Sequence, residues 1–146
     1  HCYFLGYNVA MQKRRSKYAP GEYRLRVRRS NAGKGLFTES DIPKGACIIE
    51  YIGKPVSAAN ALRDKGKYYF EVEKGLTIDG NIPANLARYI NHSCRPNCEA
   101  IGPRGRVFIA SRRRIKAGEE LTYDYGAEYF EKHIKPSGCK CAKCAV

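Results

Sequence analysis

Short apolar runs, separated by frequent turn residues, constrain the fold of this chain more than any other feature of its sequence. Tyr23, Leu25 and Val27 alternate with arginines, which is the period of a strand with one solvent-exposed face. Gly, Pro and Asn residues interrupt the runs after a few residues each. Further strand-like runs cover 36–37, 48–52, 68–72, 76–78, 106–110 and 120–123. The pattern predicts a mainly β domain built from many short strands.

Helical signals are few and short. Residues 56–65 are compatible with a helix that has Ser57 as its N-cap, because a serine hydroxyl accepts a hydrogen bond from a free N–H of the first turn. Residues 84–90 predict one or two helical turns, and 127–134 a short helix. With 146 residues, the chain has the size of one compact domain.

The charge of the chain is strongly positive. Lys and Arg number 27 against 14 Asp and Glu, a formal net charge of +13. Such an excess favours acidic partners, and we expect non-specific contact with nucleic acid through the basic surface. The plainer interpretation is a well-solvated basic surface. No stretch approaches the roughly 20 apolar residues of a membrane span, so no membrane partner is expected.

Three cysteines crowd the C-terminal tail in a C-x-C-x2-C pattern, at Cys139, Cys141 and Cys144. Disulfide frameworks favour dispersed cysteines and an oxidising compartment, whereas a tight cluster is typical of metal ligands in an intracellular protein. The cluster therefore predicts three ligands that need a fourth. The plainer alternative is a set of reduced, unliganded thiols. The other cysteines are scattered, at Cys2, Cys47, Cys94 and Cys98.

Two further motifs bring chemically useful side chains together. Asn91, His92 and Cys94 place an amide, an imidazole and a thiol within four residues. Tyr123 and Tyr125 are two residues apart, hence on one side of an extended strand. Each motif also has a plain explanation: a polar loop that satisfies its own backbone, and ordinary strand aromatics.

In their order along the chain, these motifs resemble the SET-domain family of protein lysine methyltransferases. The resemblance covers about 22–146, through segments at 29–37, 50–53, 88–98 and 118–125 and the cysteine tail. It implies a mainly β SET-domain fold of short curled β-sheets, with a C-terminal pseudoknot and a small zinc-binding post-SET tail. The implied layout is an N-terminal extension (1–21), the SET domain (22–130) and the post-SET zinc-binding segment (131–146).

The resemblance also implies a two-sided site, with S-adenosylmethionine on one face and a narrow lysine channel entered from the other. Tyr125 corresponds to the catalytic tyrosine, and Tyr51, Tyr68 and Tyr123 line the lysine channel. The implied cofactor-binding residues are Lys34, Gly35, Leu36, Arg88, Asn91, His92 and Tyr125. The implied ligands of a structural zinc ion are Cys94, Cys139, Cys141 and Cys144, a four-thiolate set suited to a closed tetrahedral site.

The chemistry of methyl transfer fits these roles. Transfer from a sulfonium to an amine is a direct displacement, so the protein mainly aligns the two groups, and alignment can supply roughly 7–11 kcal/mol. The lysine must be neutral to attack, and both an aromatic channel and the sulfonium charge lower its pKa. A tyrosine at position 123 is associated in the family with fewer added methyl groups. We therefore expect mainly mono-methylation, with di-methylation as a further product.

Several departures bear on the substrate. The family usually has C-x-C-x4-C in its tail, where this chain has a shorter last spacer; the segment 53–78 is also short, and these 146 residues lack the cysteine-rich region that precedes the domain in several branches. The substrate expected is a histone tail or nucleosome in the nucleus, and the protein is expected to depend on an activating partner. The alternatives are a methyltransferase for a non-histone protein (bacterial, or a host target of a bacterial effector), a catalytically silent nucleosome-binding module, and a zinc-containing nucleic-acid binder.

Overall fold

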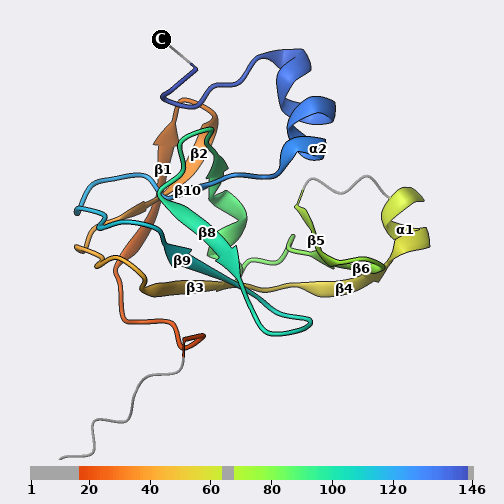
Figure 1. The fold of residues 1–146 in the computed structure, drawn as a ribbon, viewed down its shortest axis with the longest axis horizontal. Helices are drawn as coiled ribbons and strands as arrows, with labels where there is room; N and C mark the ends of the chain where they lie inside the picture. Colours follow the sequence, from red (N-terminus) through yellow and green to blue (C-terminus); the bar gives the residue numbers. More distant parts are fainter. Residues whose placement is uncertain (1–16, 64–67, 145–146) are drawn as a thin grey trace, which may run out of the picture.

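The computed structural model of the chain describes residues 17–63 and 68–144, and within them it is mainly β, as the sequence predicts. The strands form small sheets, in the orders β1-β2, β3-β9-β8, β4-β6-β5 and β10-β7. Figure 1 shows β4, β5, β6 and α1 on the right, and β3, β9 and β8 on the left with β1 and β2 above them. Residues 1–16, which include Cys2 and most of the expected N-terminal extension, lie outside the described residues.

The first hairpin follows the alternation of its sequence. β1 (Leu25–Ser30) pairs antiparallel with β2 (Gly33–Thr38), with Leu25 and Val27 half-buried and Arg26 and Arg28 exposed. Gly33 closes the hairpin with a φ of +101°, a conformation that side chains with a Cβ rarely adopt. The turn that the glycines predict is therefore present.

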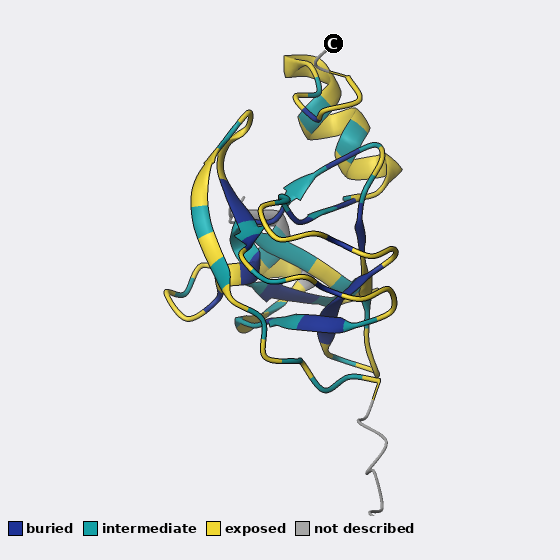
Figure 2. Cartoon of the chain, turned by 90° about the vertical axis from the view of Figure 1, so that its left-hand side faces the viewer, coloured by how far each residue is buried: buried dark blue, intermediate teal, exposed yellow. Residues whose placement is uncertain are grey.

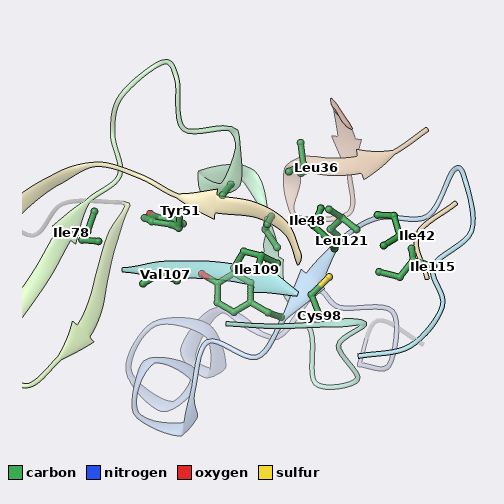
Figure 3. Close-up of a cluster of buried hydrophobic side chains, with 13 residues drawn as sticks. Leu36, Ile42, Ile48, Tyr51, Ile78, Cys98, Val107, Ile109, Ile115 and Leu121 are labelled. Carbon is green, nitrogen blue, oxygen red and sulfur yellow. The ribbon is translucent and has the colours of Figure 1, made fainter. Parts of the chain in front are cut away.

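The central sheet carries the core. β9 (Val107–Ser111) lies between β3 (Cys47–Tyr51) and β8 (Cys98–Ile101), and all five of its residues are buried. A strand covered on both faces needs apolar residues at successive positions rather than at alternate ones. Figure 3 shows Ile109 of this strand between two groups of buried side chains, one with Tyr51 and the other with Leu36 and Leu121.

The second three-stranded sheet corrects one prediction. The helix expected over 56–65 is α1 (Ala58–Arg63), and the residues before it form the strand β4 (Lys54–Ser57), which pairs with β6 (Leu76–Asp79). Pairing with β6 takes these residues out of the helix, because the chain gains a ladder of hydrogen bonds there. Ser57 still caps the helix: its Oγ accepts a hydrogen bond from the N–H of Asn60 at 3.3 Å. β5 (Tyr69–Glu73) completes the sheet, and the end of the predicted helix at 64–65 lies outside the described residues.

The two segments that the resemblance assigns to a pseudoknot lie side by side. β7 (Asn91–His92) pairs in parallel with β10 (Thr122–Tyr123), and the 3-10 turn η1 (Leu86–Tyr89) leads into β7. Two residues on each strand form a very short ladder. Asn97 reinforces it: its Nδ2 donates to the Glu120 carbonyl at 2.7 Å, and its Oδ1 accepts from the Thr122 N–H at 2.9 Å.

Replacing Asn97 with alanine should therefore destabilise the domain. Asn97 is 4% exposed, so the change would leave the part-buried N–H of Thr122 and the part-buried carbonyl of Glu120 without these hydrogen-bond partners. Each such group costs about 1–3 kcal/mol, and we expect a loss of about 2–4 kcal/mol in urea denaturation. Asn31→Ala, at an exposed turn position, is the matched control and should stay within about 0.5 kcal/mol of the native chain. Equal stability of the two variants would contradict this role for Asn97.

The C-terminal part is a run of short helical segments outside the sheets. The helix expected over 127–134 begins as α2 (Ala127–Tyr129), continues as the π-type turn η2 (Phe130–Ile134) and ends in η3 (Lys135–Ser137). Figure 2 shows this segment as largely exposed. Among the described residues, no helix combines the length and the hydrophobicity that crossing a bilayer requires.

Candidate active site and metal centre

Asn91 fastens the first hairpin to the strand pair β7-β10. Its Nδ2 lies within hydrogen-bond distance of Ser30 Oγ (3.0 Å), the Lys34 carbonyl (2.9 Å) and Glu120 Oε1 (2.8 Å). A side-chain amide has two hydrogens, so three acceptors saturate it. Gly35 permits this arrangement, because a Cβ at that position would clash with the Glu120 carboxylate. The Asn91 amide nitrogen is therefore engaged within the protein.

His92 makes two different contacts with its two ring nitrogens. Nδ1 accepts a hydrogen bond from the backbone N–H of Tyr125 at 3.1 Å, and Nε2 lies 3.4 Å from the sulfur of Cys94. Because a backbone N–H can only donate, Nδ1 is the unprotonated nitrogen and Nε2 carries the hydrogen. Burial lowers the pKa of His92, while Asp124, whose carboxylate is 3.7 Å from Nδ1, opposes that effect.

Tyr125 is held at both ends. Its hydroxyl donates to the carbonyl of Ile90, and its backbone N–H donates to His92. Burial raises the pKa of Tyr125 well above its ordinary value, so the hydroxyl stays protonated at neutral pH. It can orient a partner as a hydrogen-bonding group but is not suited to act as a general base in that range.

An aromatic wall extends from Tyr125 into the domain. The Tyr125 and Tyr123 ring centroids are 4.8 Å apart, Phe70 lies 6.0 Å beyond Tyr123, and Tyr51 lies 5.2 Å beyond Phe70. The hydroxyl of Tyr51 donates to the Tyr68 carbonyl at 2.7 Å, and burial raises the pKa of both Tyr51 and Tyr123. The wall would disfavour an ammonium that is pressed against it.

Phe70 was missing from the predicted set of channel residues. It is two positions from Tyr68, so the alternation of a strand would have placed both on one side. The ring of Tyr68 instead meets that of Tyr89 edge-on, with centroids 6.3 Å apart. Thus Tyr51, Tyr123 and Tyr125 form one continuous wall with Phe70. Tyr68 contacts this wall through its backbone carbonyl, which accepts the Tyr51 hydroxyl.

Arg88 lies against Tyr68 and Tyr89. Its guanidinium carbon is 5.5 Å from the first ring centroid and 4.8 Å from the second, and its Nη2 donates to the Tyr89 hydroxyl at 2.8 Å. Lys34 Nζ approaches the same Tyr89 ring, 5.7 Å from its centroid. The buried Nε of Arg88 has no hydrogen-bond partner among the described residues. Two cations expected at the cofactor therefore flank one aromatic ring.

Several of the predicted cofactor residues line a hollow of about 210 Å³. Asn91, His92 and Tyr125 line it together with two residues that the sequence reasoning missed, Tyr129 and His133. The rings of Tyr129 and His133 pack in a tilted arrangement with centroids 4.7 Å apart. Their spacing of four residues, which brings side chains together on a helix, was the available signal. The remaining lining residues are Ala32, Ile134, Ser137, Gly138, Cys139, Lys140 and Cys141.

Leu36 lies apart from this hollow. Its side chain is fully buried in the core, and its carbonyl accepts a hydrogen bond from the Leu121 N–H at 2.8 Å. Gly35 is next to Glu120, and the Lys34 carbonyl accepts from Asn91. The backbone of 34–36 thus borders Asn91 and Glu120.

The four cysteines expected to bind metal converge. Their sulfur atoms all lie within 4.8 Å of one another, with Cys94 at 3.8 Å from Cys139 and 3.7 Å from Cys144. A tetrahedral zinc ion with bonds of about 2.3 Å requires sulfurs about 3.8 Å apart. The shortened last spacer of the tail therefore still brings all four sulfurs into a metal-binding arrangement.

The backbone around the cluster favours a thiolate at Cys141, whereas burial raises the pKa of Cys94 and a hydrogen bond with Cys141 raises that of Cys144. Burial acts to raise the pKa of the Cys141 thiol, but the backbone N–H groups of Cys94 and Cys144 outweigh that effect and lower it to about 6. One member is therefore a thiolate at neutral pH, the form that ligates metal. Cys47 and Cys98 are buried singly in the central sheet, away from this group.

Comparison with known proteins identifies the same domain. The SET domain model matches residues 33–126. The chain is 34% identical, over 93% of its length, to Histone-lysine N-methyltransferase trithorax of Drosophila virilis. It is 37% identical, over 77% of its length, both to Histone-lysine N-methyltransferase trr of Drosophila melanogaster and to Histone-lysine N-methyltransferase 2D of Homo sapiens. The chain spans only 4%, 5% and 2% of the length of these three relatives.

A solved structure has the same fold. It is that of KRYPTONITE in complex with mCHH DNA, an H3(1-15) peptide and SAH, with a TM-score of 0.67 and 31% sequence identity. The match covers 85% of this chain and 29% of that one. The family model runs from the first residue of β2 to the residue before α2, and so includes β7, β10 and Tyr125. The chain belongs to the SET-domain family.

Proposed function

We propose that this chain methylates a lysine side chain of a histone, with S-adenosylmethionine as the methyl donor. The observation that carries the proposal is the position of Tyr125, which lines the 210 Å³ hollow and also begins the aromatic wall that continues through Tyr123 and Phe70. A residue at that junction can contact a cofactor on one side and a lysine on the other. The relatives named as histone-lysine N-methyltransferases support the same activity.

The cofactor would occupy the hollow beside Asn91, His92 and Tyr125. A neighbouring hollow of about 240 Å³ is lined by polar groups such as Arg95, Asn97 and Arg113 and does not include Tyr125, which makes it the weaker choice. The aromatic faces of Tyr129 and His133 could stack against an adenine. Bound S-adenosylmethionine would supply an electrophilic methyl group, and the KRYPTONITE complex with SAH supports its use here.

The protein residues would then prepare the lysine. The rings of Tyr51, Phe70 and Tyr123 exclude water from the amine and favour its neutral form by desolvation. The protonated hydroxyl of Tyr125 would orient the amine near the methyl group, with Tyr123 beside it. Lys34, Gly35 and Arg88 would extend the cofactor site from β2 and η1, whereas Leu36, which is buried apart from the hollow, would support it through the core.

Zinc is the metal that we propose for the four cysteines. Four thiolates with no open position suit a structural zinc ion. The site would join the tail, which supplies Cys139, Cys141 and Cys144, to the domain, which supplies Cys94. The proposed division remains a SET domain over 22–130 and a post-SET segment over 131–146.

Nucleosomes are the proposed substrate context, and chromatin the proposed location. The exposed Arg26 and Arg28 of β1 and Arg24 just before it recur at every second residue, so one face of this segment can approach phosphates. The KRYPTONITE complex with an H3 peptide and DNA supports a histone substrate. Dependence on an activating partner stays a prediction.

The direct test is a methyl-transfer assay with labelled S-adenosylmethionine on core histones and on nucleosomes, with products identified by mass spectrometry. We expect label on histone lysine, and a preference for nucleosomes that weakens as salt rises. Cofactor binding without transfer, even when a partner and non-histone proteins are supplied, would favour the catalytically silent module. Absence of cofactor binding would refute the proposal.

Tyr123→Phe should change the product. The buried hydroxyl of Tyr123 occupies space and can hold the amine or a water, which limits the room for a second or third methyl group. Its removal should shift mainly mono-methylated product toward di- and tri-methylated product, at a similar rate for the first methyl. Mass spectrometry of a single-site peptide over time measures the distribution. Steady tri-methylation by the native chain would contradict this role of Tyr123.

A further inference from the structure

The His92 side chain contacts both the cysteine cluster and the backbone of Tyr125. Its Nε2–H points to the sulfur of Cys94 at 3.4 Å, and its Nδ1 accepts the Tyr125 N–H at 3.1 Å. The side chain is only 6% exposed, and its ring packs against those of Tyr125 and Phe130, each with centroids 5.5 Å away. These contacts leave the imidazole little freedom to rotate.

The sulfur of Cys94 changes character when a metal binds. A metal-bound sulfur is a thiolate and accepts a charge-assisted hydrogen bond, whereas a free thiol is a weak acceptor and can itself donate. Metal binding therefore strengthens the hydrogen bond from the Nε2–H of His92 to the Cys94 sulfur. The opposite edge of the same rigid ring holds the N–H of Tyr125.

We propose that His92 is a positioning residue that couples metal occupancy of the cysteine cluster to the placement of Tyr125. With the metal bound, the Cys94 thiolate orients the imidazole so that Nδ1 faces the Tyr125 amide. Without the metal, the ring loses that anchor, and the hydrogen bond from the Tyr125 N–H to His92 Nδ1 weakens. The proposal rests on the roles proposed above for the cluster and for Tyr125, and it adds a physical link between them.

Tyr125 is sensitive to the orientation of His92 because both of its hydrogen-bond partners, Ile90 and His92, belong to one short segment. Its hydroxyl donates to the Ile90 carbonyl, two residues before His92, and His92 itself pairs with Tyr123 in the β7-β10 ladder. A change in the orientation of the His92 ring therefore acts on one of two fixed points of Tyr125. The backbone of the ladder, by contrast, has its own bond from the Ser93 N–H to the Tyr123 carbonyl at 3.1 Å.

Hydrogen exchange of single amides, followed by NMR, tests the coupling without any methyl transfer. The native chain is measured loaded with Zn²⁺ and after chelation, and the Tyr125 amide is compared with that of Ser93. Loss of one hydrogen bond should raise exchange of the Tyr125 amide about fivefold more than that of Ser93. The Ser93 amide controls for general fraying of the β7-β10 ladder.

Two substitutions separate the two edges of the ring. His92→Asn places an amide oxygen close to the position of Nδ1, but its side chain is too short to reach Cys94. In this variant, chelation should raise exchange of the Tyr125 amide no more than exchange of the Ser93 amide. His92→Gln places an amide nitrogen close to the position of Nε2, so its Tyr125 amide should exchange fast in both states. Both variants are compared with Asn31→Ala, which should behave as the native chain.

The outcomes distinguish this coupling from the proposed activity. An excess response of Tyr125 in the native chain that disappears in His92→Asn supports the coupling, even if no substrate is ever methylated. The same excess response in both chains would overturn it, since the effect would then pass through the tail and not through His92. No excess response in the native chain, or failure of Zn²⁺ to bind, would overturn it as well.

Discussion

Tyr125→Phe is expected to lower the rate of methyl transfer at least about 100-fold while cofactor affinity changes only a few-fold. The substitution removes one oxygen and keeps the ring that packs against Tyr123 and Tyr129. Without the hydroxyl, the amine loses its proposed hydrogen-bonding partner at the start of the aromatic wall. Misplacement of a reacting group by about 1 Å is enough for a loss of that size.

The measurement separates binding from chemistry. Calorimetric titration with S-adenosylmethionine gives the affinity, and single-turnover transfer to a histone substrate gives the rate. Tyr23→Phe, at a half-buried tyrosine packed against the core, is the matched control for loss of a hydroxyl. The Ile90 carbonyl loses its donor in Tyr125→Phe, so thermal unfolding must show that the fold survives. Transfer at the native rate by a folded variant would remove Tyr125 from the catalytic role.

The expected pH dependence of the transfer rate follows from the burial of Tyr125. Burial raises the folded-state pKa of Tyr125, so its hydroxyl is protonated throughout the neutral and mildly alkaline range. Deprotonation of Tyr125 would therefore not cause a gain in rate with rising pH up to about 9, whereas deprotonation of the substrate lysine is expected to give one. The protonated hydroxyl supports the role of an orienting group.

Alternation in the sequence predicted the strands whose two faces differ. Leu25 and Val27 are half-buried and Arg26 and Arg28 exposed, so the period of two is visible in both sequence and structure. β4 was missed because Lys54, Pro55 and Ser57 show no such alternation; it lies at a sheet edge, where a proline costs no ladder bond. β8 was missed because a run of four residues containing one glutamate gives little signal.

Local motifs led to the site, but its long-range partners were hidden. Asn91 and His92 are adjacent in sequence, whereas Asn91 meets Ser30 across 61 positions and Glu120 across 29. Phe70 and Tyr129 carry no motif of their own: Phe70 reaches the aromatic wall from β5, and Tyr129 reaches the hollow from α2. Spacing along the chain reports such contacts only within one strand or one helical turn.

Removal of the metal is expected to weaken cofactor binding at least about tenfold and to melt the tail before the β domain. The cluster joins Cys94, which follows β7, to Cys139, Cys141 and Cys144 of the tail, and Cys139 and Cys141 also line the cofactor hollow. Without the metal, binding must order this segment, at about 1–2 kcal/mol for each residue fixed. A tenfold loss corresponds to only about 1.4 kcal/mol, so it is a conservative expectation.

Chelation and Cys141→Ser should give the same result by different routes. Atomic absorption measures bound zinc, calorimetric titration measures cofactor affinity, and hydrogen exchange compares the tail with β9, which is buried throughout and should stay protected. Cys47→Ala, at a buried cysteine outside the cluster, controls for loss of a thiol and should keep its zinc. If the native chain loses its zinc and binds S-adenosylmethionine as tightly as before, the tail has no part in the cofactor site. A tenfold loss of affinity for S-adenosylmethionine in both the chelated chain and Cys141→Ser, but not in Cys47→Ala, would support the conclusion that the short C-x-C-x2-C tail closes the cofactor hollow.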